Sequence, residues 1–207
     1  MDKQYIIKLL EKIKNIMALN KDYLIQLDSV VGDGDLGLTM SDGFLAAYNA
    51  VKDSDEEDLG KLLYNAGKAM SIAVPSTMGT LMASGLMNAG KVLKGTTQIS
   101  LEDIAKLFEA YLDGVALRGK AKVGEKTFLD GLAPAVHSLK TSVRNEDSLE
   151  QAASNAEYAA EEGFRNTTTM IAVHGRAATR GEASMSLQDP GAAVAMLIMR
   201  AFNESIK

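Results

Sequence analysis

The stretch SLEDIAKLFEAYL, residues 100–112, shows most directly how this chain folds. Ser100 can accept hydrogen bonds from the free backbone N–H groups at a helix start, and two acidic residues follow it in the first turn. Apolar side chains then recur every three or four residues, at Ile104, Leu107, Phe108, Tyr111 and Leu112. This spacing places them on one face of a helix. The stretch therefore predicts an amphipathic α-helix that packs on a core.

The same periodicity recurs along the chain, and no segment shows the sustained alternation of a β-strand. Segments 6–17 and 59–70 carry it most clearly. Further helices are expected at about 37–52, 80–94, 127–141, 148–172 and 192–206. We therefore predict an all-α fold of about eight helices, with the chemistry in the loops between them.

Length and composition fit one domain that spans residues 1–207. Apolar residues make up 46% and charged residues 24%, a balance typical of a folded protein. The absence of cysteine excludes disulfides and thiolate chemistry, and a net charge of −5 argues against a nucleic-acid partner. The longest apolar run, Ala192 to Met199, is too short to cross a membrane, and the N-terminus has no signal-peptide pattern. We expect a cytoplasmic protein with no membrane partner.

The loop DSVVGDGDLG, residues 28–37, brings three aspartates and three glycines into ten positions. Carboxylates this close repel one another unless a cation lies between them, and their oxygens suit Mg²⁺ or Ca²⁺. An EF-hand is excluded because its twelfth position needs Glu, whereas counting from Asp28 gives Thr39 and from Asp33 gives Phe44. A solvated acidic turn remains the alternative. We predict a magnesium site that holds phosphate.

Three further loops carry residues suited to anions. Ser76 and Thr77 precede a predicted helix and can present hydroxyl and N–H groups, although helix capping alone would explain them. The stretch 118–127 gathers four cations and two glycines, and it can also be a plain basic surface loop. The long excursion 174–191 contains Arg176, whose planar guanidinium suits phosphate but would also serve a surface ion pair.

Taken in order, these loops resemble a known family. The motifs are GDGDLG at 32–37, GKA and GEKT within 119–127, GRA and GE within 175–182, and DPG at 189–191. They resemble the nucleotide-binding L subunit of bacterial dihydroxyacetone kinase over nearly the whole chain. The resemblance implies a barrel of eight antiparallel helices with the nucleotide in loops at one end.

The resemblance also assigns roles to residues. Asp28, Asp33 and Asp35 would form the catalytic metal site, holding two Mg²⁺ ions against the phosphates of ADP or ATP. Further nucleotide contacts would fall on Leu36, Gly37, Leu38, Thr39, Ser76, Thr77, Gly119, Phe128, Arg176, Asp189, Pro190 and Gly191.

The implied reaction is a phosphoryl relay in which bound ADP takes a phosphoryl group from a phosphohistidine protein of the phosphotransferase system. The group then passes to dihydroxyacetone on a separate K-type subunit. ATP remains open as the donor, and a non-catalytic nucleotide sensor or a purely structural bundle are the alternatives. Lys120, Lys122 and Lys126 are expected to steer partners electrostatically. Neither His137 nor His174 is nominated as a phosphohistidine.

The chain departs from the family pattern at two places. Leu36 stands where the family usually has His, and Leu cannot donate a hydrogen bond to phosphate. Val74 and Pro75 replace a glycine-rich turn, and Met78 replaces a glycine. These changes leave the aspartates intact, so the interpretation extends to a paralogue that acts on another short ketose such as a tetrulose.

Overall fold

The computed structural model describes residues 1–207 and contains helices but no strands. The expectation of an all-α fold is confirmed. The elements are α1 (Lys3–Leu19), α2 (Lys21–Val31), α3 (Leu36–Asn49), α4 (Leu59–Ala73), α5 (Thr77–Val92), α6 (Leu101–Gly119), α7 (Phe128–Arg144), α8 (Leu149–Asn166), the short 3₁₀ segments η1 (Thr167–Thr169) and η2 (Arg176–Ser184), and α9 (Pro190–Ile206).

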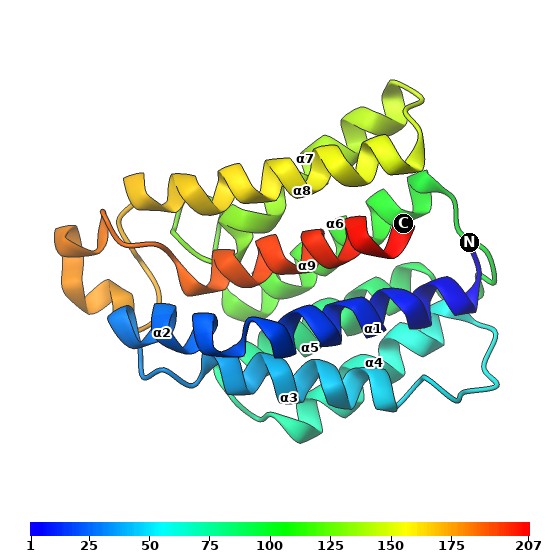
Figure 1. Cartoon of the computed structure of the whole chain (residues 1–207), viewed down its shortest axis with the longest axis horizontal. Helices are drawn as coiled ribbons and strands as arrows, with labels where there is room; N and C mark the ends of the chain where they lie inside the picture. Colours follow the sequence, from blue (N-terminus) through cyan, green and yellow to red (C-terminus); the bar gives the residue numbers. More distant parts are fainter.

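The helices from α3 to α9 each pack on the next in chain order, and α1 packs on both α9 and α3. These pairs close a ring in which the helices run along the long axis of the molecule (Figure 1). Both termini lie at one end, whereas the α2–α3 loop and η2 lie at the opposite end (Figure 1). The ring therefore separates a terminal end from a loop end.

One continuous core of 51 buried side chains fills the space between the helices. Phe108 of α6 and Phe202 of α9 meet there edge to face, with ring centroids 5.2 Å apart. Where α4 and α5 cross, a Cβ atom on Gly60 would lie 2.3 Å from the carbonyl oxygen of Gly90. Glycine is therefore required for this close approach.

The predicted start of α6 is confirmed in detail. The Ser100 hydroxyl accepts a hydrogen bond from the Asp103 backbone N–H, and the Asp103 side chain accepts one from the Ser100 N–H. This reciprocal capping box satisfies two donors that the helix itself leaves unpaired.

The expectation of about eight helices omitted α2. Only Leu24 and Val31 among its eleven residues are buried, and the short apolar stripe of Leu24, Leu27 and Val31 was not recognised as a separate helix. At the junction with α1, the Asn20 side chain donates to the Ile16 carbonyl at 2.9 Å and helps to close the first helix. The structure thus has nine α-helices, with α2 extending α1 toward the loop end (Figure 1).

The helix predicted at 148–172 is too long, because α8 ends at Asn166. The hydroxyls of Thr167, Thr168 and Thr169 each donate to the carbonyl three residues earlier, at 2.6–2.8 Å. Such bonds compete with the α-helical pattern, and the chain tightens into η1. None of the helices combines the length and the apolar character that a membrane crossing needs.

Candidate functional site

The loops at the end opposite the termini enclose a cavity of about 480 Å³. The last turns of α2 and α6 reach it, and α3, α5, α7 and α9 all begin there. The α8–α9 connection also contributes to its wall. Residues from separate parts of the chain therefore face one space.

The predicted aspartate cluster forms one side of this cavity. One carboxylate oxygen each from Asp28, Asp33 and Asp35 lies within 4.8 Å of the others. Asp28 also shapes the turn, because its Oδ2 accepts hydrogen bonds from the N–H groups of Gly34 at 2.9 Å and Leu36 at 3.4 Å. Gly34 has φ +76°, a conformation that favours glycine. The donor set of three carboxylates suits a hard cation such as Mg²⁺.

Burial and the closeness of the other two carboxylates change the pKa of Asp35. Partial burial, followed by the nearby charges of Asp33 and Asp28, raises the pKa of its carboxyl group. Arg176 opposes this effect, and its guanidinium donates to Asp33 at 2.6 Å. Arg176 thus pairs with only one of the three aspartates, and a bound cation would relieve the remaining repulsion.

Four helix starts face the same cavity, through Leu36, Thr77, Phe128 and Pro190. The first backbone N–H groups of a helix lack partners within it, and the helix dipole adds a partial positive charge. At α3, the side chain of the capping residue Asp35 forms no capping bond, and the Leu36 N–H donates to Asp28 at 3.4 Å. Together these helix starts give the cavity a surface suited to anions.

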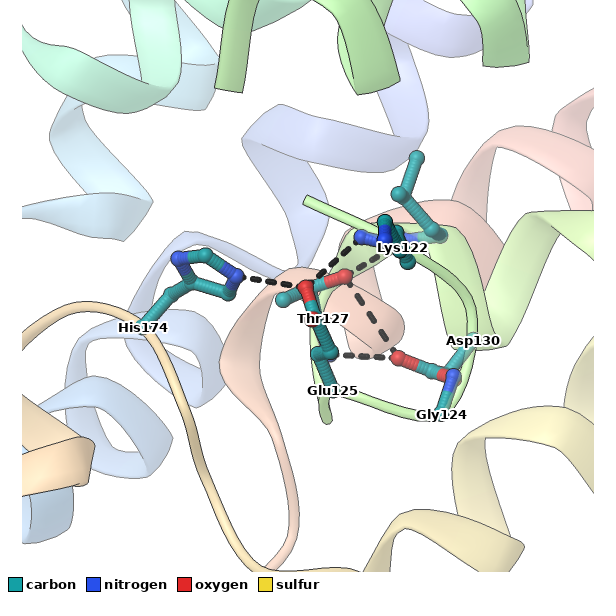
Figure 2. A network of polar contacts seen from close by, with 7 residues as sticks. Lys122, Gly124, Glu125, Thr127, Asp130 and His174 are labelled. Atoms are coloured by element: carbon teal, nitrogen blue, oxygen red, sulfur yellow. Dashed lines mark hydrogen bonds and ion pairs between the residues drawn. The ribbon is translucent and has the colours of Figure 1, made fainter. Parts of the chain in front are cut away.

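The α6–α7 loop is folded by two carboxylates (Figure 2). The buried Asp130 accepts hydrogen bonds from the N–H groups of Gly124 at 2.5 Å and Thr127 at 2.7 Å. Glu125 accepts from the Lys122 N–H at 2.7 Å and lies 2.6 Å from Nε2 of His174. The bond to His174, and then that to Lys122, lowers the pKa of Glu125. His174 therefore links the α8–α9 connection to this loop.

The start of α9 is buried beside the cavity. Asp189 accepts a hydrogen bond from the Ala192 N–H at 2.7 Å, and its own N–H donates to the Thr167 hydroxyl at 3.1 Å. Burial raises the pKa of Asp189 to about 7. A Cβ atom on Gly191 would lie 3.0 Å from the backbone nitrogen of Phe128, so the starts of α7 and α9 are in close contact.

The structure brings most of the predicted site residues together. Those that line the cavity are Asp28, Asp33, Asp35, Leu36, Ser76, Thr77, Gly119, Phe128, Arg176, Asp189, Pro190 and Gly191. Gly37, Leu38 and Thr39 do not line it. Gly37 packs against the Lys21 carbonyl, Thr39 is buried, and Leu38 is exposed.

Lys126 differs from its expected role in steering partners. It is buried, with 3% of its surface exposed, and its ammonium group donates to main-chain carbonyls. Lys120 and Lys122 are exposed, as steering requires.

Sequence reasoning also missed residues that line the cavity. Thr127, which caps α7, and His174 lie in the stretches 118–127 and 174–191, which the sequence marks as suited to anions. Their positions in the sequence do not indicate that both line the same cavity. Met78, Leu81 and Val115 form an apolar part of the wall. Their spacing matches that of ordinary core residues, so no signal in the sequence separates them from the core.

Comparison with known proteins identifies the family of this chain. The model of the DAK2 domain matches residues 30–204. The chain is 33% identical over 195 residues to the ADP-binding subunit DhaL of the PEP-dependent dihydroxyacetone kinase of Escherichia coli (strain K12), covering 94% of this chain and 93% of that subunit. It is 30% identical to the L-erythrulose 1-kinase of Mycolicibacterium smegmatis, covering 97% of this chain and 35% of that kinase.

Among solved structures, the native dihydroxyacetone kinase of C. freundii matches with a TM-score of 0.75 at 23% identity over 97% of this chain. The same kinase in complex with AMP-PNP and Mg²⁺ matches with a TM-score of 0.72 at 22% identity over 96% of this chain. The chain spans about a third of the length of these kinase chains, at 34% and 33%. The two matches establish a shared helical fold.

The family match and the cavity involve the same part of the molecule. The matched residues 30–204 include Asp33, Asp35 and the starts of α3, α5, α7 and α9. The match covers well over half of the chain and extends through every helix from α3 to α9. On this evidence, the chain belongs to the DAK2 domain family.

Proposed function

We propose that this protein is the ADP-binding subunit of a dihydroxyacetone-kinase-type enzyme. The observation that carries the proposal is the arrangement of three carboxylates, within 4.8 Å of one another, in one cavity with several helix starts. Carboxylates would hold magnesium, and free N–H groups would bind the phosphates that the metal bridges. A magnesium nucleotide presents both of these chemical features.

Asp28, Asp33 and Asp35 would hold two Mg²⁺ ions, whose positive charge stabilises negative charge on a transferring phosphoryl group. Phosphate contacts would come from the start of α3 at Leu36 and from the Ser76–Thr77 turn, which line the cavity. Arg176 already contacts Asp33 at 2.6 Å, so its guanidinium lies where a metal-bound phosphate would sit.

The remaining wall suits the rest of a nucleotide. Gly119, Phe128 and the turn from Asp189 to Gly191 all line the cavity, together with the apolar side chains of Leu81 and Val115. A volume of about 480 Å³ lies within the usual range for small-molecule sites. We assign this part of the cavity to the base and ribose of ADP or ATP.

The proposed reaction is a relay of a phosphoryl group through the bound nucleotide to a short ketose. The donor would be a phosphohistidine protein of the phosphotransferase system or ATP, and the ketose would be held by a K-type subunit. The E. coli DhaL subunit has nearly the same length as this chain, since the match covers 93% of it. That relative is named as an ADP-binding subunit of a kinase, which supports a role beside partner subunits.

The acceptor is assigned only as dihydroxyacetone or a similar short ketose. The relatives include both dihydroxyacetone kinases and L-erythrulose kinases. The acceptor would be bound by the partner subunit, so residues of this chain do not select among these sugars.

Leu36 favours one second candidate, a nucleotide sensor without catalysis. Its side chain is 3% exposed and belongs to the apolar core, so it offers no hydrogen bond to phosphate. A lost hydrogen bond to a charged group corresponds to about 1.5–3 kcal/mol. Such a loss would favour exchange of the nucleotide over its retention.

Analysis of the purified protein tests the proposal first. After denaturation, chromatography and elemental analysis should find near-stoichiometric ADP and magnesium. An empty protein that then binds Mg–ATP exchangeably would instead favour the sensor. The protein is then mixed with a K-type subunit, dihydroxyacetone or erythrulose, and either the phosphohistidine protein or ATP as donor. The mixture should yield the sugar phosphate. No turnover with either donor would contradict the kinase assignment.

A pair of variants then tests the metal site. Asp33→Ala should weaken Mg-dependent ADP binding about a hundredfold or more, because a charged ligand is lost. Asp42→Ala is the matched control, because Asp42 is exposed on α3 and does not line the cavity. Unchanged ADP binding by Asp33→Ala, measured by calorimetry with helical content verified by circular dichroism, would contradict the metal assignment.

A further inference from the structure

Lys126 is the one lysine whose ammonium group is enclosed by main-chain carbonyls. Its Nζ donates to the carbonyl oxygens of Met170 at 3.1 Å, Ser184 at 2.5 Å, Met185 at 3.1 Å and Leu187 at 2.6 Å. No carboxylate lies within ion-pair distance of it, and burial lowers the pKa of this lysine. The three ammonium protons are therefore fully occupied by backbone oxygens, and the group cannot at the same time serve a phosphate.

These carbonyls belong to both ends of one segment, residues 170–187, which connects η1 to α9. Between Ile171 and Gln188 only Ala172 and Ser184 are buried, so apolar packing does little to fix the segment. Its middle nevertheless places His174 and Arg176 on the wall of the cavity. Polar bonds must therefore hold this segment in position.

Lys126 is the buried side chain that links this segment to the α6–α7 loop, with 3% of its surface exposed. Within the segment, the Ala172 N–H donates to the Ser184 hydroxyl at 2.9 Å, which is also a buried bond. The contacts of side chains with the rest of the protein are exposed or partly exposed: His174 with Glu125, Arg176 with Asp33, and Arg180 with the Val30 carbonyl. Hydrogen bonds that involve a charged group are stronger when they are shielded from water. The ammonium of Lys126 also joins Met170 to the stretch 184–187, so that it closes the base of the segment.

We propose that Lys126 is a positioning residue whose ammonium group fastens the two ends of segment 170–187 together and thereby holds His174 against Glu125 and Arg176 against Asp33 on the wall of the cavity. Its effect on nucleotide binding rests on the proposed function, whereas the fastening itself can be measured on the protein without nucleotide. An internal cation held by four carbonyls occupies a place that a small ammonium ion could also fill.

The first experiment uses Lys126→Met, which keeps an apolar stem and removes all three donors. Trypsin cleavage after Arg176 and Arg180, followed by mass spectrometry without nucleotide, should become about tenfold faster or more, because the segment opens more often. Lys120→Met is the matched control, since Lys120 is an exposed lysine in the same loop with a similar positive φ, 53° against 59°. Equal cleavage rates in the wild type and Lys126→Met would overturn the proposal.

The second experiment asks whether the ammonium group itself is responsible. Lys126→Ala should leave a space bounded by the four carbonyls, and methylammonium should restore slow cleavage, whereas tetramethylammonium, which has no N–H donor, should not. Rescue by both ions or by neither would indicate a general loosening of the fold and would overturn the role of the ammonium group. Trypsin activity on an unrelated substrate is measured under each salt.

A third measurement needs no variant and applies if the substitutions prevent folding. In the wild-type protein, NMR should detect one lysine ammonium group whose protons exchange with water at least tenfold more slowly than those of the other lysines. No protected ammonium signal would overturn the proposal. Mg–ADP titration separates the two hypotheses: wild-type protein that binds no nucleotide contradicts the proposed function, while the cleavage and exchange results decide the role of Lys126.

Discussion

The aspartate loop and segment 170–187 face each other at the cavity, yet they are held in different ways. In the aspartate loop, Asp28 accepts hydrogen bonds from Gly34 and Leu36, only six and eight residues further along. Segment 170–187 has a local bond from the Ala172 N–H to the Ser184 hydroxyl, but the bonds that tie it to the α6–α7 loop come from Glu125 and Lys126, 44 to 61 residues away. One wall of the site is thus folded by its own sequence, and the other depends on a distant loop. Substitutions should therefore act locally on the first wall and change the placement of the second.

Asp28 offers the strongest test of the local wall. Asp28→Ala removes both a proposed metal ligand and the acceptor for the Gly34 and Leu36 N–H groups. We expect Mg–ADP binding to weaken about a hundredfold, and hydrogen exchange of these two amides to accelerate. Asp28→Asn keeps an acceptor of the same shape but loses the charge, so binding should weaken while the amides stay protected. Binding by Asp28→Ala within threefold of the wild type, measured by calorimetry, would refute the metal role.

Asp189 tests the buried base of the second wall through pH. Burial raises its pKa from 3.8 to about 7, so between these values the folded protein binds more protons than the unfolded chain. The free energy of unfolding should therefore fall as pH rises, by about 2 kcal/mol between pH 5 and pH 7. Asp189→Asn keeps a helix-capping oxygen and should abolish this dependence. Urea unfolding at several pH values checks it, with Asp42→Asn as control, and an unchanged slope in Asp189→Asn would contradict the assignment.

The difference between the walls also explains which features the sequence could predict. The capping box at Ser100 and the cluster of Asp28, Asp33 and Asp35 are local patterns, and the structure contains both. By contrast, α2 buries only two residues, and its apolar pattern is short enough to have been missed. The partners of Lys126 are backbone carbonyls, which every residue possesses, so no residue type marks them in the sequence. Charge alone therefore suggested a surface role for a lysine that is buried.

Arg176 tests the contact between the two walls. Its ion pair with Asp33 is exposed, and exposed pairs contribute little to the free energy of unfolding. Arg176→Ala should therefore leave thermal unfolding unchanged but weaken Mg–ADP binding about tenfold, because a guanidinium contact to phosphate is lost. Arg118→Ala is a suitable control, since Arg118 is exposed and does not line the cavity. A loss of stability without a loss of binding would mean that Arg176 serves only the structure.

His174 should give the smallest effect, and it sharpens the contrast between buried and exposed bonds within one wall. His174 and Lys126 both tie segment 170–187 to the α6–α7 loop, but the His174 side chain is 36% exposed, whereas Lys126 is buried. Water competes for the exposed bond, so His174→Ala should accelerate trypsin cleavage after Arg176 by about threefold or less. Glu125→Gln, which removes the charge of the partner, should match it. The contrary result is that His174→Ala accelerates cleavage as much as Lys126→Met does. That result would show that burial does not explain the effect of Lys126, and that the number of bonds to the segment determines its protection.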